Sequence, residues 1–233
     1  MMETLKNKTI YITGGSKGIG LGIAMEALKQ GMRVAISARN IKGIDLSSVQ
    51  STDLLVLQSD VRNAKDEENA ITQIMDRWGT LDVLVANAGI GHFAPVDQLT
   101  HEQWNDTIDT NLTGVFNSVK AAIPALKKSA GYIITIASLA GTNFFAQGAA
   151  YNASKFGLVG FTQAIMLDLR PYKIKVSTIM PGSVATYFND HIPTDKDAWK
   201  IQPEDIGQLV IDLLKMNPRT LPSKIEIRPA QTS

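Results

Sequence analysis

The sequence predicts an α/β fold built on a doubly wound, parallel sheet of about seven strands with helices on both faces. Short β-branched runs alternate with longer segments of helical period, a pattern typical of βαβ units. A glycine-rich segment, TGGSKGIG, follows the first of these runs. No repeat, low-complexity tract or linker rich in Pro, Gly or Ser divides the chain, so residues 1–233 are expected to form a single domain.

The elements follow one another in alternation along the chain. β-Branched and apolar runs predict strands at 8–13, 33–37, 54–57, 81–86, 132–137, 174–179 and 224–227. Helical periodicity predicts helices at 18–30, 64–78, 101–127, about 151–171 and 203–214. Residues 183–202 show neither pattern and follow the carboxyl end of a strand, where ligands of open α/β sheets bind. They are therefore predicted to form a short substrate lid.

The composition argues against several classes of function. A net charge of +1, with Lys and Arg scattered along the chain, argues against nucleic acid as a partner. The chain has no cysteine and only three isolated histidines, so neither disulfides nor a metal site is expected. No apolar run approaches the roughly 18 residues of a membrane span, and the N-terminus lacks the apolar core of a signal peptide. A cytoplasmic protein that does not bind membranes is expected.

The glycine-rich segment predicts a phosphate-binding turn of the Rossmann type. Its glycines permit a tight turn and a close approach of the backbone to a pyrophosphate, and the following helix directs its N-terminus at the anion. A flexible turn is the alternative, but the position between a strand and a helix favours nucleotide binding. The expected cofactor-binding residues here are Gly14, Ser16, Lys17, Gly18, Ile19 and Gly20.

Charges near the second strand favour NADP(H) over NAD(H). Sites selective for NAD place an Asp or Glu about 20 residues beyond the glycine-rich turn, where it accepts from the ribose 2′-hydroxyl. This chain has Ser37-Ala38-Arg39-Asn40 there. The guanidinium of Arg39 suits a 2′-phosphate, and Lys17 could add a second cation. Either residue alone could equally be a solvated surface charge.

With a Tyr-x-x-x-Lys at 151–155, the chain resembles the short-chain dehydrogenase/reductase family over nearly its whole length. The resemblance rests on motifs in the family's order: TGGSKGIG, Asp60-Val61, Asn87-Ala88-Gly89, Asn111, Ser138, Tyr151-Asn152-Ala153-Ser154-Lys155 and Pro181-Gly182. Ala86 departs from the family's usual Asn, and residues 39–60 and the lid are short. The family resemblance implies further cofactor contacts from Asp60, Val61, Asn87, Ala88, Gly89, Tyr151, Lys155, Pro181, Gly182, Val184 and Thr186.

The resemblance implies a catalytic set of Asn111, Ser138, Tyr151 and Lys155. Carbonyl reduction needs a hydride at carbon, which the nicotinamide supplies, and a proton at oxygen, which the protein must supply. Tyr151 is the expected proton donor, and Lys155, one helical turn away, is expected to lower the pKa of its phenol. Ser138 would hold the substrate oxygen. The resemblance assigns to Asn111 a water that links the lysine to solvent.

The predicted substrate is a small, apolar carbonyl compound or alcohol. Residues expected near the pocket are mostly apolar: Ile90, His92, Phe93, Leu139, Phe144, Phe145, Tyr187, Phe188 and Trp199. Two alternatives to an NADP(H)-dependent carbonyl reductase stay open: a 3-oxoacyl-thioester reductase and a non-catalytic NADP(H)-binding regulatory protein. The resemblance also implies a homodimer or homotetramer. The apolar Phe116, Val119, Phe161 and Ile165 fit such an interface, and fit packing against the sheet equally well.

Overall fold

The structure, a computed structural model, describes residues 4–42 and 53–231. Its centre is a seven-stranded sheet of order β3-β2-β1-β4-β5-β6-β7 in which every pairing is parallel. The predicted doubly wound sheet is confirmed. Its strands are β1 (Thr9–Thr13), β2 (Arg33–Ala38), β3 (Leu54–Gln58), β4 (Val83–Ala86), β5 (Tyr132–Ile136), β6 (Lys175–Pro181) and β7 (Lys224–Ile227).

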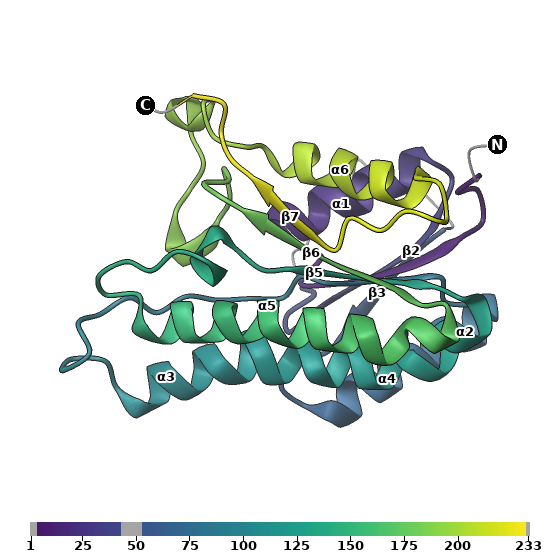
Figure 1. The fold of residues 1–233 in the computed structure, drawn as a ribbon, viewed down its shortest axis with the longest axis horizontal. Helices are drawn as coiled ribbons and strands as arrows, with labels where there is room; N and C mark the ends of the chain where they lie inside the picture. The colour runs from purple at the N-terminus through teal and green to yellow at the C-terminus, as the bar shows by residue number, and fades with distance from the viewer. Residues whose placement is uncertain (1–3, 43–52, 232–233) are drawn as a thin grey trace.

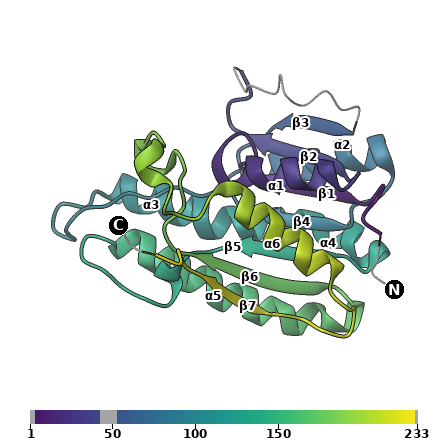
Figure 2. The ribbon, with the colours of Figure 1, turned by 90° about the horizontal axis from the view of Figure 1, so that it is seen from above.

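Helices cover both faces of the sheet (Figures 1 and 2). One face carries α1 (Gly18–Lys29) and α6 (Pro203–Lys215), and the other carries α2 (Ala64–Trp78), α4 (Gly114–Ser129) and α5 (Ala149–Leu169). The central strands are buried on both sides, which explains their continuous apolar runs. In β1, Ile10 and Ile12 belong to the apolar cluster on the α1 side, and Tyr11 belongs to the opposite cluster. Within the described ranges no helix combines the length and apolarity needed to cross a membrane.

Several element boundaries differ from the sequence prediction. The helix predicted at 101–127 is α3 (His101–Ile108), a π-helical turn at Asp109–Thr113, and then α4. β4 begins at Val83, two residues later than predicted, and the carboxylate of Asp82 just before it accepts from the Thr9 amide. Residues 183–202 contain two short 3-10 turns and one parallel bridge between Val184 and Ile201. Of the short stretch 39–60, residues 43–52 lie outside the described residues.

A fully buried carboxyl group ties the first three strands to α2. Glu67 accepts from the hydroxyl of Ser59 at 2.6 Å and from that of Tyr11 at 3.0 Å. Tyr11 is also 2.9 Å from the hydroxyl of Ser37. Burial raises the pKa of Glu67, and the hydroxyl donors lower it in part. The cluster satisfies a polar group that would otherwise destabilise the core.

Two glycines allow α1 and α6 to pack backbone to backbone. A Cβ atom on Gly22 would lie 2.5 Å from the carbonyl oxygen of Pro203, and one on Gly207 would lie 2.7 Å from that of Gly22. Both contacts are with backbone atoms, which cannot rotate away as a side chain can. The spacing of the two helices therefore depends on the absence of side chains at these positions.

We expect Gly22→Ala to lower the free energy of unfolding by about 1–3 kcal/mol, because the added methyl overpacks the helix contact. Gly160→Ala on α5 is the matched control, since a Cβ there would meet nothing within 4 Å. That control should stabilise the chain by about 0.5–1 kcal/mol through the unfolded-state entropy of glycine. Urea unfolding of both variants makes the comparison, and equal effects at the two sites would contradict the packing argument.

Candidate active site

The glycine-rich turn has a shape that side chains would destroy. Gly14 and Gly18 have φ values of 65° and 56°, in the left-handed region that favours glycine. A Cβ atom on Gly20 would lie 2.4 Å from the carbonyl oxygen of Gly14, and one on Gly14 would lie 2.9 Å from the Cα of Ala88. The turn is thus pressed against the end of β4. Its backbone forms a cradle at the N-terminus of α1 that fits a pyrophosphate.

Asn87 fastens this turn to β4. Its side-chain amide donates to the carbonyl oxygens of Thr13, at 2.9 Å, and Gly14, at 3.1 Å. The Thr13 hydroxyl accepts in return from the amides of Asn87 and Ala88, both at 3.1 Å. Ala86, where the resembled family has an asparagine, is a buried strand residue. The hydrogen bonds that anchor the turn are therefore made by Asn87, Ala88 and Thr13.

A cavity of about 930 Å³ runs along the carboxyl ends of the strands. It brings together most of the residues predicted to bind cofactor. Those lining it are Gly14, Ser16, Lys17, Gly18, Ile19, Arg39, Asp60, Val61, Asn87, Ala88, Gly89, Tyr151, Lys155 and Thr186. Gly20 lies beneath the turn.

Three predicted contact residues do not reach the cavity. Pro181 is the last residue of β6 and pairs with Ile227. Gly182 donates its amide to Ile227 at 2.8 Å, and Val184 bridges to Ile201. β6 runs further than the sequence indicated, and β7 holds its end. A cofactor-binding role for these three residues stays a prediction. Thr186, two residues beyond Val184, is the residue of this segment that faces the cavity.

Tyr151 and Lys155 lie one turn apart on α5, and both line the cavity. The ammonium of Lys155 donates to the carbonyl oxygen of Ile136, at the end of β5, at 3.0 Å. It lies 5.7 Å from the centre of the Tyr151 ring. Ser138, just beyond β5, accepts from the Ala140 amide at 3.1 Å, and its hydroxyl lies near enough to the Tyr151 phenol to offset part of the rise that burial causes in the pKa of that group. A tyrosine, a serine and a lysine thus converge where β5 meets α5.

Burial shifts the acidity of both titratable groups. It raises the pKa of the Tyr151 phenol, an effect that the Ser138 hydrogen bond partly offsets. It lowers the pKa of Lys155 from 10.5 to about 8. The sequence predicted a lowered pKa for Tyr151, and this is corrected: the Lys155 ammonium is directed at Ile136, so desolvation dominates at the phenol. In this state Tyr151 is a protonated phenol at neutral pH.

Asn111 lies in the π-helical turn between α3 and α4, and it is fully buried. Its carboxamide accepts from the Ile90 amide at 2.8 Å and donates to the Ile90 carbonyl at 2.8 Å and to the Ser154 hydroxyl at 3.0 Å. It thus joins the chain after β4 to α5. The widened turn directs this side chain inward, in keeping with the frequent use of π-bulges at functional sites.

Aromatic rings cover the Tyr151 side of the cavity. Phe93 lies 5.4 Å and Phe188 5.6 Å from the Tyr151 ring, between ring centres. Phe93 and Phe188 are themselves 6.2 Å apart, so the three rings form one cluster. Of the residues predicted for the pocket, those lining the cavity are Ile90, His92, Tyr187 and Phe188. Phe93 and Phe145 pack behind them, and Leu139, Phe144 and Trp199 do not line the cavity.

Sequence reasoning missed several residues that line the cavity. Among them are Asn40, Lys42, Ser59, Asp106 and Thr110. Asn40 and Lys42 directly follow Arg39 and could have been found by extending the search past the second strand. Asp106 and Thr110 belong to no sequence motif, because only the packing of α3 and of the π-helical turn after it brings them to the site. Among the described residues, no His, Asp and Glu side chains gather as a candidate metal site.

Comparison with known proteins decides the family. The model of the short chain dehydrogenase family matches residues 8–197, most of the chain. The chain belongs to the short-chain dehydrogenase family. Members of this family are oxidoreductases that bind a nicotinamide cofactor, NAD or NADP. The glycine cradle and the cavity described above suit such a cofactor, because side chains are excluded where its pyrophosphate would approach the backbone.

Two characterised relatives and one solved structure illustrate the likeness. The chain is 33% identical to trans-4-hydroxycyclohexanecarboxylate dehydrogenase of Sinomonas cyclohexanicum, over 91% of this chain and 87% of that protein. It is 32% identical to the 3-oxoacyl-[acyl-carrier-protein] reductase of Staphylococcus aureus, over 78% and 77%. An alcohol dehydrogenase of Thermococcus sibiricus, complexed with 5-hydroxy-NADP, superposes with a TM-score of 0.90 at 26% identity, covering 98% and 99%.

We expect Lys155→Met to raise the thermal stability of this short-chain dehydrogenase at neutral pH. The folded-state pKa of Lys155, about 8, lies below its ordinary 10.5, so the fold disfavours the ammonium. That penalty is complete below about pH 8 and is relieved as the pH rises toward 10.5. The gain in melting temperature should shrink over this range. A difference in melting temperature between the variant and the wild type that does not change with pH would contradict the burial argument.

Proposed function

We propose that the chain is an NADP(H)-dependent oxidoreductase that interconverts a ketone or aldehyde and an alcohol, with Tyr151 as general acid and base. One observation carries the proposal. Tyr151 and Lys155 line the same cavity as the glycine cradle, and the Ser138 hydroxyl lies near enough to the phenol to offset part of the rise that burial causes in its pKa. Proton transfer to a substrate carbonyl oxygen can therefore take place beside the site that suits a nicotinamide cofactor.

In the reduction direction, Tyr151 donates its phenolic proton to the substrate oxygen. The phenol carries this proton at neutral pH. Ser138 donates a hydrogen bond to the same oxygen and holds the carbonyl in place. A bound nicotinamide cofactor supplies the hydride for the carbonyl carbon. Oxidation of the alcohol reverses these transfers, with Tyr151 accepting the proton.

Lys155 and Asn111 support this step. The Lys155 ammonium, with a pKa near 8, can both stabilise the developing phenolate and return a proton to it near neutral pH. Asn111 holds the Ile90 segment against Ser154 and so fixes the wall facing Tyr151. The water-holding role that the family resemblance implies for Asn111 stays a prediction.

Three cations that line the cavity favour NADP(H) over NAD(H). Lys17, Arg39 and Lys42 all line it, from the glycine-rich turn and from the chain after β2. A 2′-phosphate carries about two negative charges, and a guanidinium pairs with phosphate oxygens through two hydrogen bonds. The solved alcohol dehydrogenase that superposes on the chain was crystallised with an NADP derivative, which is consistent with this preference.

The aromatic cluster favours an apolar substrate. Phe188 and Tyr187 line the cavity beside Tyr151, and Phe188 also packs against Phe93. We assign residues 183–202 as the substrate lid. The whole chain is then one catalytic domain, and its carbonyl site is walled mainly by rings. The cyclohexane ring in the name of the Sinomonas relative agrees with such a wall.

A 3-oxoacyl-thioester reductase is the second candidate. It is favoured by the Staphylococcus aureus relative, named for that activity. An acyl carrier would need a basic surface at the cavity mouth, where Lys196 and Lys200 are the lysines of the 183–202 lid. Lys200 is already paired with Asp197 at 2.5 Å. The regulatory alternative finds no support in the converging Ser138, Tyr151 and Lys155.

Assembly into a homodimer or homotetramer stays part of the proposal. Phe116 on α4 is 44% exposed and stacks edge to face with Phe161 on α5, at 6.3 Å between ring centres. Val119 is buried in the core, and Ile165 packs against the same cluster. Of the four apolar residues considered for an interface, Phe116 is the most exposed and therefore the most available to a second copy.

We expect Tyr151→Phe to lower kcat by about 10²–10⁴-fold, because the variant has no phenolic proton to transfer. NADPH binding should be retained, since the ring is kept. Steady-state kinetics on a panel of apolar ketones and aldehydes, with NADPH fluorescence titration as the control, provides the measurement. A Tyr151→Phe variant with wild-type turnover would refute the proposed acid.

We expect Arg39→Asp to shift cofactor preference toward NADH by about 100-fold, because the carboxylate repels a 2′-phosphate and can accept from a ribose hydroxyl. The ratio of kcat/KM with NADPH to that with NADH measures the preference. An unchanged ratio would show that Arg39 does not bind the phosphate.

A further inference from the structure

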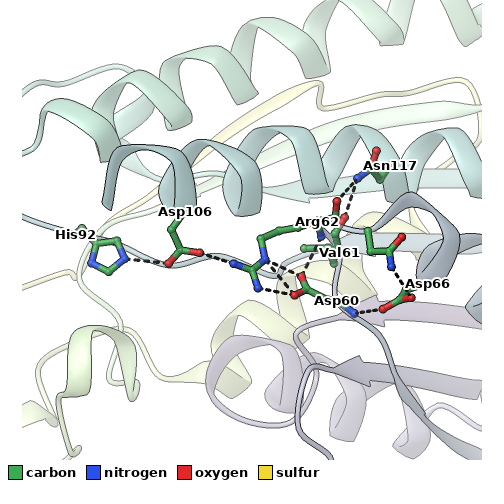
Figure 3. Close-up of polar contacts among 8 residues, drawn as sticks. Asp60, Val61, Arg62, Asp66, His92, Asp106 and Asn117 are labelled. Carbon is green, nitrogen blue, oxygen red and sulfur yellow. Dashed lines mark hydrogen bonds and ion pairs between the residues drawn. The ribbon is translucent and has the colours of Figure 1, made fainter. Parts of the chain in front are cut away.

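A chain of charged side chains follows one wall of the cavity (Figure 3). The Arg62 guanidinium lies between two carboxylates, with Nη2 2.6 Å from Asp60 Oδ2 and Nη1 2.7 Å from Asp106 Oδ1. The other Asp106 oxygen is 3.0 Å from Nε2 of His92. Asp60, Asp106 and His92 line the cavity. Arg62 thus links the loop after β3 to α3 and, through Asp106, to the chain after β4.

The backbone around Arg62 is fixed without its side chain. The Asp60 amide donates to Asp66 at 3.1 Å, and the Asn117 side chain on α4 donates to the carbonyl oxygens of Val61, at 2.9 Å, and Arg62, at 3.3 Å (Figure 3). These bonds hold the loop between β3 and α2. The Arg62 guanidinium is therefore not needed to hold this loop, and its effect is on the carboxylates of Asp60 and Asp106.

Arg62 controls the charge of this wall. Two carboxylates face a cavity that suits a cofactor with several phosphates, and like charges disfavour each other. The guanidinium cancels one of the two negative charges. Its hydrogen bonds also hold the pKa of Asp60 below the ordinary value, so this carboxylate stays ionised and able to accept hydrogen bonds at neutral pH.

We propose that Arg62 is a positioning residue for the nicotinamide cofactor, holding Asp60 in place as an acceptor and offsetting the negative charge of Asp106 that the cofactor phosphates meet. The inference rests on the proposed cofactor site. The donors suited to the Asp60 carboxylate are amine and ribose hydroxyl groups, which NADPH and NADH share. Arg62 therefore supports the binding of both, unlike Arg39.

The test is the binding of NADPH and of NADH, measured by fluorescence titration without any carbonyl substrate. Arg62→Gln should raise the Kd for both cofactors by about fivefold, as expected for the loss of partly exposed ion pairs. The kcat at saturating cofactor and the melting temperature should change little. Arg228→Gln is the matched control, since Arg228 also pairs with a carboxylate, Glu226 at 3.1 Å, but does not border the cavity.

Two further variants separate charge from simple loss of structure. Arg62→Lys keeps the charge and should recover part of the affinity, and Arg62→Gln combined with Asp106→Asn should recover most of it. Unchanged Kd values in Arg62→Gln, or a loss with NADPH alone, would overturn the proposal, as would a double variant no tighter than the single one. If Arg62→Gln does not fold, two single variants decide the question. The affinity for both cofactors should fall in Arg62→Lys, and it should stay the same or rise in Asp106→Asn. A wild type that binds neither cofactor would instead refute the proposed function.

Discussion

The close backbone contact between the glycine-rich turn and the end of β4 is the constraint on which the rest of the site depends. Gly14 and Gly20 leave no room for side chains there. Asn87 then reaches the carbonyl oxygens of Thr13 and Gly14, and this fixes the spacing of β1 and β4. Because the chain leaves these strands toward opposite faces of the sheet, a crevice opens between them at this point. The cavity, the N-terminus of α1 and the Ala88-Gly89 wall all follow from that contact.

The fold buries two kinds of ionisable group near this crevice, and they differ in what surrounds them. Glu67 is fully buried and its acceptors are met by hydroxyl donors, so it joins β1, β2 and β3 to α2 as part of the core. Lys155 is nearly as buried, yet it lines the cavity, where its ammonium donates to the Ile136 carbonyl oxygen. An ammonium held this way destabilises the fold at neutral pH. In the proposed function, the same desolvation is what brings its pKa near the pH at which protons are exchanged.

The cavity is electrically uneven along its length. The pKa of the Asp60 carboxyl is lowered by Arg62 and also by Arg39, which follows β2 and lies close to it, whereas aromatic rings surround Tyr151. The ion pairs of Arg62 moderate two carboxylates of the cavity wall. In the proposed function, the 2′-phosphate of the cofactor lies by Arg39 and the substrate lies beside the rings.

The sequence by itself determined the layer architecture, most element positions and the residues of the glycine cradle. Periodicity and turn chemistry are local properties, and Tyr151 and Lys155 share a face through helical spacing alone. Only the tertiary structure decided that β6 extends to Pro181 against β7 and that Val184 bridges to Ile201. It also brought Asp106 beside Arg62, and it reversed the expected pKa shift of Tyr151. Ion pairs between distant segments and the desolvation of buried groups depend on how the elements pack, and local sequence patterns do not determine that packing.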